Sequence, residues 1–151
     1  MTRFFRRTAL LALLLACAGC MTGRQQFPPP DPSGKTLTGQ MLYSGPKRTF
    51  VGDFTARVSA TDFYLSVSKG PGVPLFSVRK SGGTLARIET PNRSWQGNPQ
   101  HFIPGPVRSW LALGDVLAGK PVESAQVTRT DGRVTAEFAS THERFVFQLS
   151  H

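Results

Sequence analysis

The chain has 151 residues, with 18 Lys and Arg against 9 Asp and Glu, a formal net charge of +9, and two cysteines, Cys17 and Cys20. Because no cysteine lies beyond position 20, the rest of the chain has neither an internal disulfide nor a cysteine metal site. After an N-terminal segment, the remaining length suits one domain of typical size and is too short for two.

The first 16 residues predict an export signal. Arg3, Arg6 and Arg7 precede an uncharged run over residues 8–16 that is mostly Leu and Ala, which is the order of a secretory signal. This run is shorter than the roughly 20 apolar residues that span a bilayer. We therefore interpret residues 1–16 as a signal peptide.

The two cysteines stand in a context that resembles the lipobox of bacterial lipoproteins, in which small residues precede a cysteine that receives a diacylglycerol. Leu14-Leu15-Ala16-Cys17 fits this pattern better than the residues before Cys20, and both cysteines remain candidates for lipidation. The resemblance implies a covalent lipid anchor in a membrane. In enterobacterial lipoproteins an Asp directly after the lipidated cysteine retains the protein in the inner membrane, and neither cysteine here is followed by one. The resemblance therefore implies the outer membrane, with the protein facing the periplasm. The alternative is an ordinary cleaved signal that leaves a soluble protein.

The basic residues of the mature chain are spread out along the sequence. Without the three signal arginines, 15 Lys and Arg remain against 9 Asp and Glu, a charge of +6. Export excludes most nucleic acid as a partner. We interpret the basic residues as a solvated surface that favours anionic lipid headgroups, with solubility alone as the alternative.

Residues 17–47 are predicted to be a flexible linker. They are rich in Gly, Pro, Gln, Ser and Thr, and Pro28-Pro29-Pro30 favours an extended polyproline stretch. A short apolar patch over residues 41–43 is the one part that could dock on the domain as a first strand. The folded domain is then expected over residues 48–151.

The domain is predicted to be α+β, an antiparallel sheet of about seven or eight strands with one covering helix. Apolar and polar residues alternate in segments bounded by turn residues, as in half-buried strands. The predicted strands are residues 49–59, 63–68, 74–80, 84–90, 123–129, 133–139 and 144–149. Residues 92–105 are expected to form a loop, and Asp131-Gly132 a tight hairpin turn.

One helix is predicted from Pro106 to about residue 118. Val107, Trp110, Leu111, Leu113, Val116 and Leu117 recur at helical spacing. Pro106 suits the first turn, and Gly119 suits the C-terminal cap.

The sequence offers little for catalysis, so we expect no enzyme, no cofactor and no metal. The three histidines, His101, His142 and His151, lack the close spacing of zinc ligands on one element. Neither a Gly-x-Ser-x-Gly elbow nor a phosphate-binding Gly-x-x-x-x-Gly-Lys loop occurs. The carboxylates, Glu143 included, fall mostly at turns or on outward strand positions, where we expect them to be solvated.

The order of elements resembles the LolA/LolB family of envelope carriers, half-barrels of antiparallel strands under helices that pass acylated lipoproteins to the outer membrane. The likeness lies in residues 63–73 (FYLSVSKGPGV), 103–114 (IPGPVRSWLALG) and 127–149. The family presents an exposed Leu in its Pro-containing turn, where this chain has Gly72 and Val73. The family also has a helix ahead of the sheet, where this chain has the Pro-rich linker.

The resemblance implies a curved half-barrel that binds an acyl chain of a lipid or lipoprotein. The entrance for the acyl chain would be formed by Val73, Leu75 and Phe76. It would lie under a movable helix that carries Trp110 and Leu111. The expected ligand-binding residues are Phe50, Phe54, Phe63, Leu65, Val73, Leu75, Phe76, Trp110 and Leu111. We expect a monomer. The alternative is a non-enzymatic structural or protein-binding module tethered to the membrane, in which the same residues are plain core.

Overall fold

The computed structural model describes residues 31–101 and 103–150. The predicted signal peptide and both candidate lipidation sites, Cys17 and Cys20, lie outside these residues. The described elements are β1 (Lys35–Ser44), β2 (Thr49–Val58), β3 (Phe63–Ser68), β4 (Pro74–Ser81), β5 (Leu85–Thr90), β6 (Arg93–Gly97), α2 (Gly105–Ala118), β7 (Gln126–Thr130), β8 (Arg133–Phe138) and β9 (Glu143–Leu149). None of the helices among them is long and apolar enough to cross a membrane.

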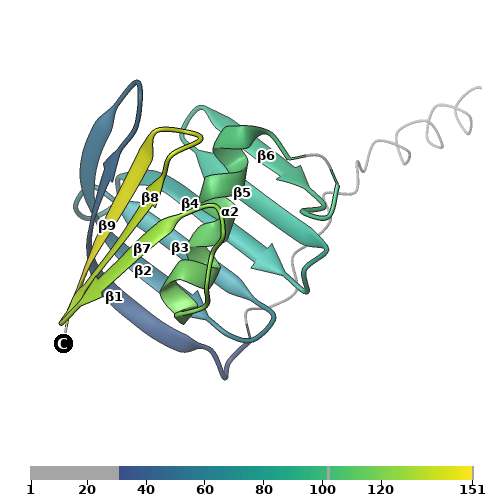
Figure 1. The fold of residues 1–151 in the computed structure, drawn as a ribbon, viewed down its shortest axis with the longest axis horizontal. Coiled ribbons are helices and arrows are strands. Elements are labelled where there is room, and N and C mark those ends of the chain that lie inside the picture. Colours follow the sequence, from purple (N-terminus) through teal and green to yellow (C-terminus); the bar gives the residue numbers. More distant parts are fainter. Residues whose placement is uncertain (1–30, 102, 151) are drawn as a thin grey trace, which may run out of the picture.

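All nine strands belong to one antiparallel sheet in the order β6-β5-β4-β3-β2-β1-β9-β8-β7. The sheet curls around α2, which crosses its concave face as a single diagonal helix (Figure 1). The predicted architecture, an antiparallel sheet with one helix, is confirmed at this level. The sheet has nine strands among the described residues, more than the seven or eight expected.

Strand β1 replaces part of the predicted linker. It pairs with β2 along its whole length and with β9 from Gly39 onward, so it lies in the middle of the sheet. Met41 and Tyr43 point into the core and are 0% and 5% exposed. The folded domain therefore begins near Lys35 instead of residue 48, because alternating apolar residues form a strand despite the Gly, Ser and Thr around them.

Strand β6 lies where a loop was predicted over residues 92–105. It is a five-residue edge strand that pairs with β5 only. Trp95 packs against the core, while Ser94 and Gln96 face solvent. A strand this short, with one apolar side chain, carries too little periodicity to be recognised in the sequence.

The helix agrees with its prediction. Pro106 is its second residue, and Gly119 caps it in the left-handed conformation with φ 79°, donating its backbone N–H to the carbonyl of Val116. Gly114 faces the sheet so closely that a Cβ atom there would lie 2.7 Å from Cγ of Phe63. The lack of a side chain at Gly114 thus sets how near the helix lies to β3.

The described residues contain their own core. Twenty-one buried side chains, from Met41 in β1 to Phe147 in β9, form one cluster between the concave face and α2. Every strand has its partners within residues 35–149. Residues 31–151 therefore have what an independently folding domain requires.

Candidate functional site

The predicted ligand-binding residues gather on the concave face of the sheet and the facing side of α2. Six of them are buried in the common core: Phe54, Phe63, Leu65, Phe76, Trp110 and Leu111. Phe50 and Leu75 are half-buried and pack against that core. Val73 differs from the rest, since 52% of its surface is exposed.

An aromatic cluster lies between the N-terminal half of α2 and strands β1, β4 and β9. The indole of Trp110 stands edge-on to Phe76, with ring centres 4.3 Å apart, and also contacts Tyr43 and Phe145 at 5.0 and 5.2 Å. Phe50 bridges Tyr43 and Phe76 at the border of this cluster. Such edge-to-face pairs add about 1 kcal/mol each beyond the area they bury. The helix is therefore packed against the sheet at this end through these aromatic rings.

The turn between β3 and β4 presents an apolar side chain to solvent. Its backbone closes with the N–H of Lys69 donating to the carbonyl of Val73 at 2.8 Å. Gly70 and Gly72 adopt φ values of 65° and 78°, which residues other than glycine seldom reach. This tight turn leaves Val73 exposed two residues before the half-buried Leu75.

A buried carboxylate ties α2 to the sheet. Glu143, at the start of β9, is 5% exposed and accepts three hydrogen bonds. The Tyr43 hydroxyl and the Trp110 indole N–H each donate to Oε1 at 2.9 Å, and the Ser109 hydroxyl donates to Oε2. A buried charge is costly unless its hydrogen-bonding capacity is met. Removal of either Glu143 or these donors would therefore leave buried polar groups without hydrogen bonds.

The prediction that Glu143 is solvated is wrong. Glu143 is in phase with Phe145 and Phe147, two and four residues later, and so points to the concave face. This alternation was the available signal in the sequence. Tyr43 and Ser109 were also missed, because their partner lies 100 and 34 residues away.

Tyr43 is held in its neutral form. Burial, and then the hydrogen bond to Glu143, raise the pKa of its hydroxyl above the usual value of 10.0. The hydroxyl therefore remains a donor to the carboxylate across the physiological range of pH.

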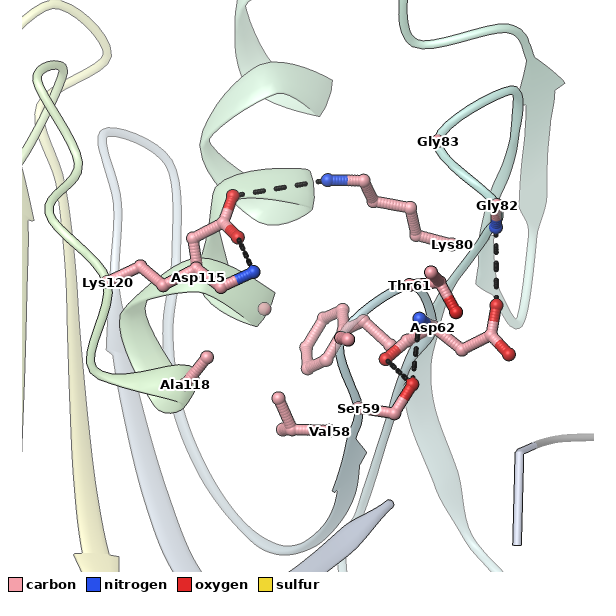
Figure 2. Close-up of a pocket in the computed structure, with 13 residues that line it drawn as sticks. Val58, Ser59, Thr61, Asp62, Lys80, Gly82, Gly83, Asp115, Ala118 and Lys120 are labelled. Carbon is pink, nitrogen blue, oxygen red and sulfur yellow. Dashed lines mark hydrogen bonds and ion pairs between the residues drawn. The ribbon is translucent and has the colours of Figure 1, made fainter. Parts of the chain in front are cut away.

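A recess lies at the C-terminal end of α2, against the β2–β3 and β4–β5 turns (Figure 2). It has a volume of about 260 Å³ and is lined by charged residues around an apolar base. Lys80 and Lys120 approach Asp115 at 4.0 and 3.7 Å, and Asp62 accepts hydrogen bonds from the Ser81 hydroxyl and the Gly82 N–H. Because Asp115 faces both lysines and Asp62 braces the β4–β5 turn, we interpret these charges as fixing this end of the helix.

The histidines among the described residues lie on the surface. No group of three or more His, Cys, Asp or Glu residues in the part of the chain that the structure describes could hold a metal ion. His101 and His142 are both exposed, and His142 occupies the β8–β9 turn with φ 53°. Glu143 beside it turns inward to Tyr43, Ser109 and Trp110.

A scan against protein-family models gives no match to this chain, and a search of curated proteins gives no significant match either.

Proposed function

We propose that this chain is a lipid-anchored protein of the bacterial outer membrane, facing the periplasm, that binds an acyl chain of a lipid or lipoprotein during its transport. The observation that supports this proposal most is the curved antiparallel sheet with a largely apolar concave face under a single 14-residue helix. The likeness of the sequence to the LolA/LolB carriers points the same way. Recognition of the acyl chain would be non-covalent.

Binding at the aromatic cluster would require α2 to move, because Trp110 packs there against Tyr43, Phe76 and Phe145. Freeing Trp110 from its packing and from Glu143 costs about 5–8 kcal/mol, the sum of losing a buried Trp and a hydrogen bond to a charged group. Burial of an acyl chain contributes about 0.8 kcal/mol per CH₂, or about 10 kcal/mol for a chain of 12 methylenes. An acyl chain is thus long enough to offset the opening of the helix, whereas a short apolar molecule is not.

The β3–β4 turn is the proposed contact for the arriving chain. Val73 is exposed, and two residues later the half-buried Leu75 packs against the core that contains Phe76 and Trp110. The proposed path therefore runs from the exposed Val73 past Leu75 to the aromatic cluster. Phe76 itself is 3% exposed, so it belongs to the inner end of this path.

The chain offers a matched pair of substitutions for testing this path. Val73 and Val51 are 52% and 54% exposed, but Val51 faces outward from β2, away from α2. We expect Val73→Asp to lower the uptake of a diacylated lipopeptide by the domain of residues 31–151 about tenfold, and Val51→Asp to leave it unchanged. Uptake is measured by native mass spectrometry and by displacement of a fluorescent fatty acid, with circular dichroism as the check on folding.

The results of these uptake measurements distinguish the role of the β3–β4 turn from the carrier proposal itself. Equal uptake by both variants would remove the β3–β4 turn from the path. A wild-type domain that takes up no lipopeptide at any concentration would overturn the carrier proposal altogether.

The filled core supports a second candidate, a tethered structural or protein-binding module of the envelope. In that case the aromatic cluster and the bonds to Glu143 serve stability alone. Absence of lipid uptake together with capture of a defined envelope partner would favour it.

A further inference from the structure

Three arginines that are far apart in the sequence stand side by side on the outer face of the sheet, opposite α2. Strand register places Arg57 of β2 opposite Tyr64 of β3, Tyr64 opposite Arg79 of β4, and Arg79 opposite Arg87 of β5. Directly opposite residues have their Cβ atoms about 5 Å apart on the same face. The four side chains, which we term the arginine row, therefore form one row that extends across four strands for about 14 Å.

The arginine row has a composition that suits anionic groups. Like charges directly opposite each other, as in Arg79 and Arg87, destabilise a sheet unless something compensates them. The neighbouring row across the same strands is Thr55, Ser66, Ser77 and Glu89, so it adds three hydroxyl groups and one carboxylate. Arg87 uses part of its capacity on Glu89 and Gln96, at 3.4 and 2.7 Å.

The arginine row lies on an open face of the sheet, which favours an extended partner such as a layer of phosphate groups. Guanidinium groups bind phosphate oxygens in a bidentate manner, and tyrosine is favoured where an apolar environment meets a wet one. All four side chains of the arginine row are partly exposed on a sheet face that no helix of the described residues covers. A line of cations on an open face presents itself to a plane of phosphates, whereas a small anion is bound better in a concave site.

The chain leaves the domain at the Arg57 end of the arginine row. Thr36 is opposite Arg57 in the β1–β2 pair, and a Cβ atom at Gly34 would lie 2.9 Å from Cγ of Arg57. Asp31 is also close enough for the charge of Arg57 to help lower its pKa, after hydrogen bonds from Ser33 as the largest cause. A lipid anchor on Cys17 or Cys20 would thus be joined to the domain beside this surface.

We propose that the arginine row is the surface by which the domain lies on an anionic phospholipid membrane. This inference rests on the lipid anchor of the proposed function, since the anchor keeps the domain near the bilayer. With the outer face against the headgroups, α2 and the β3–β4 turn remain accessible to an arriving acyl chain.

The test is vesicle sedimentation of the unlipidated domain, residues 31–151, with phosphatidylcholine vesicles with and without phosphatidylglycerol. We expect binding to the anionic vesicles only, weakening with salt. The triple substitution Arg57→Ser, Arg79→Ser and Arg87→Ser should lower this binding roughly 100-fold, since each basic residue near an anionic surface contributes about a fivefold gain. The matched control is Arg108→Ser, Arg133→Ser and Arg144→Ser, which removes the same charge from other parts of the domain and should change binding less than threefold.

A single substitution is expected to change vesicle binding in the opposite direction. It therefore tests the proposal even if the triple variant fails to fold. Glu89→Gln removes the carboxylate beside the arginine row and should strengthen binding to anionic vesicles severalfold. If the two triple variants lose vesicle binding equally, binding depends only on net charge, and the proposal is overturned. Binding of soluble anionic glycan, but not of vesicles, through the same arginines would also overturn it.

Failure of this proposal is distinguishable from failure of the acyl-chain proposal. Lipopeptide uptake is measured without vesicles and depends on Val73, in the β3–β4 turn. Vesicle binding is measured without lipopeptide and depends on the arginine row.

Discussion

Oε1 of Glu143 accepts hydrogen bonds from two elements at once, from Tyr43 in β1 and from Trp110 in α2. The raised pKa of Tyr43 gives this contact a pH dependence whose sign is fixed. Below pH 10 the tyrosine is neutral in both the folded and the unfolded chain, so the hydrogen bond contributes its full stability. Above pH 10 the unfolded chain ionises first, and the contribution is lost as pH rises toward the folded pKa.

Tyr43→Phe is therefore expected to have an effect that depends on pH. At pH 8 the loss of a hydrogen bond to a buried carboxylate should lower the free energy of unfolding by about 1–3 kcal/mol. Above pH 10 the difference between wild type and variant should shrink by up to about 1.4 kcal/mol per pH unit. Urea unfolding from pH 8 to pH 11 measures this difference, with Tyr64→Phe on the outer face as the control. A difference that stays constant over this range would contradict the assignment.

The elements differ in how much of their identity is carried by local sequence. Helix α2 was predicted to within one residue because Trp110, Leu113 and Leu117 repeat at helical spacing and Gly119 provides the cap. The local sequence of β1 favours a linker, because its Gly and Thr residues are common in linkers and in strands alike. Only its pairing with β2 and β9 decides for a strand. Strand β6 depends in the same way on its neighbour β5. Strands that are defined by tertiary pairing are the ones local patterns miss.

The approach of α2 to β3 is an element-scale property that one glycine tests. Gly114→Ala should lower the free energy of unfolding by about 1–3 kcal/mol, because the new Cβ would lie 2.7 Å from Cγ of Phe63. Gly105→Ala in the same helix meets nothing within 4 Å and should be neutral or stabilising, as helix propensity alone predicts. Phe63→Leu in the Gly114→Ala background should recover part of the loss. Equal effects of the two Gly→Ala substitutions in urea unfolding would contradict this close contact.

At the scale of the whole molecule, residues that the sequence separates meet through strand register. Arg57, Arg79 and Arg87 were interpreted as parts of a dispersed basic surface, and only the β2–β5 pairing aligns them. The ligand-binding residues were predicted as one set, and most do share one core. Their degree of burial could not be predicted, because alternation assigns a residue to a face of the sheet without telling whether that face encloses space.

The filled core makes the proposed function depend on whether α2 can leave the sheet while the sheet stays folded. The helix satisfies most of its backbone hydrogen bonds internally, whereas β1 and β9 are each paired on both sides, so opening of α2 disrupts fewer bonds than opening of the sheet. Glu143→Gln leaves an amide that cannot accept from Ser109 through its nitrogen, and it removes the charge that strengthens the other two bonds.

We therefore expect Glu143→Gln to raise hydrogen exchange over residues 109–118 about tenfold, the effect of losing 1–2 kcal/mol of attachment. Exchange in the centres of β1 and β9 should change far less, because it requires global unfolding. Hydrogen–deuterium exchange with mass spectrometry resolves these segments, and Glu137→Gln, at an exposed ion pair with Arg144, is the matched control. Equal acceleration in α2 and in the central strands would mean that Glu143 supports the fold as a whole, and an acyl chain would then have no separate helix to displace.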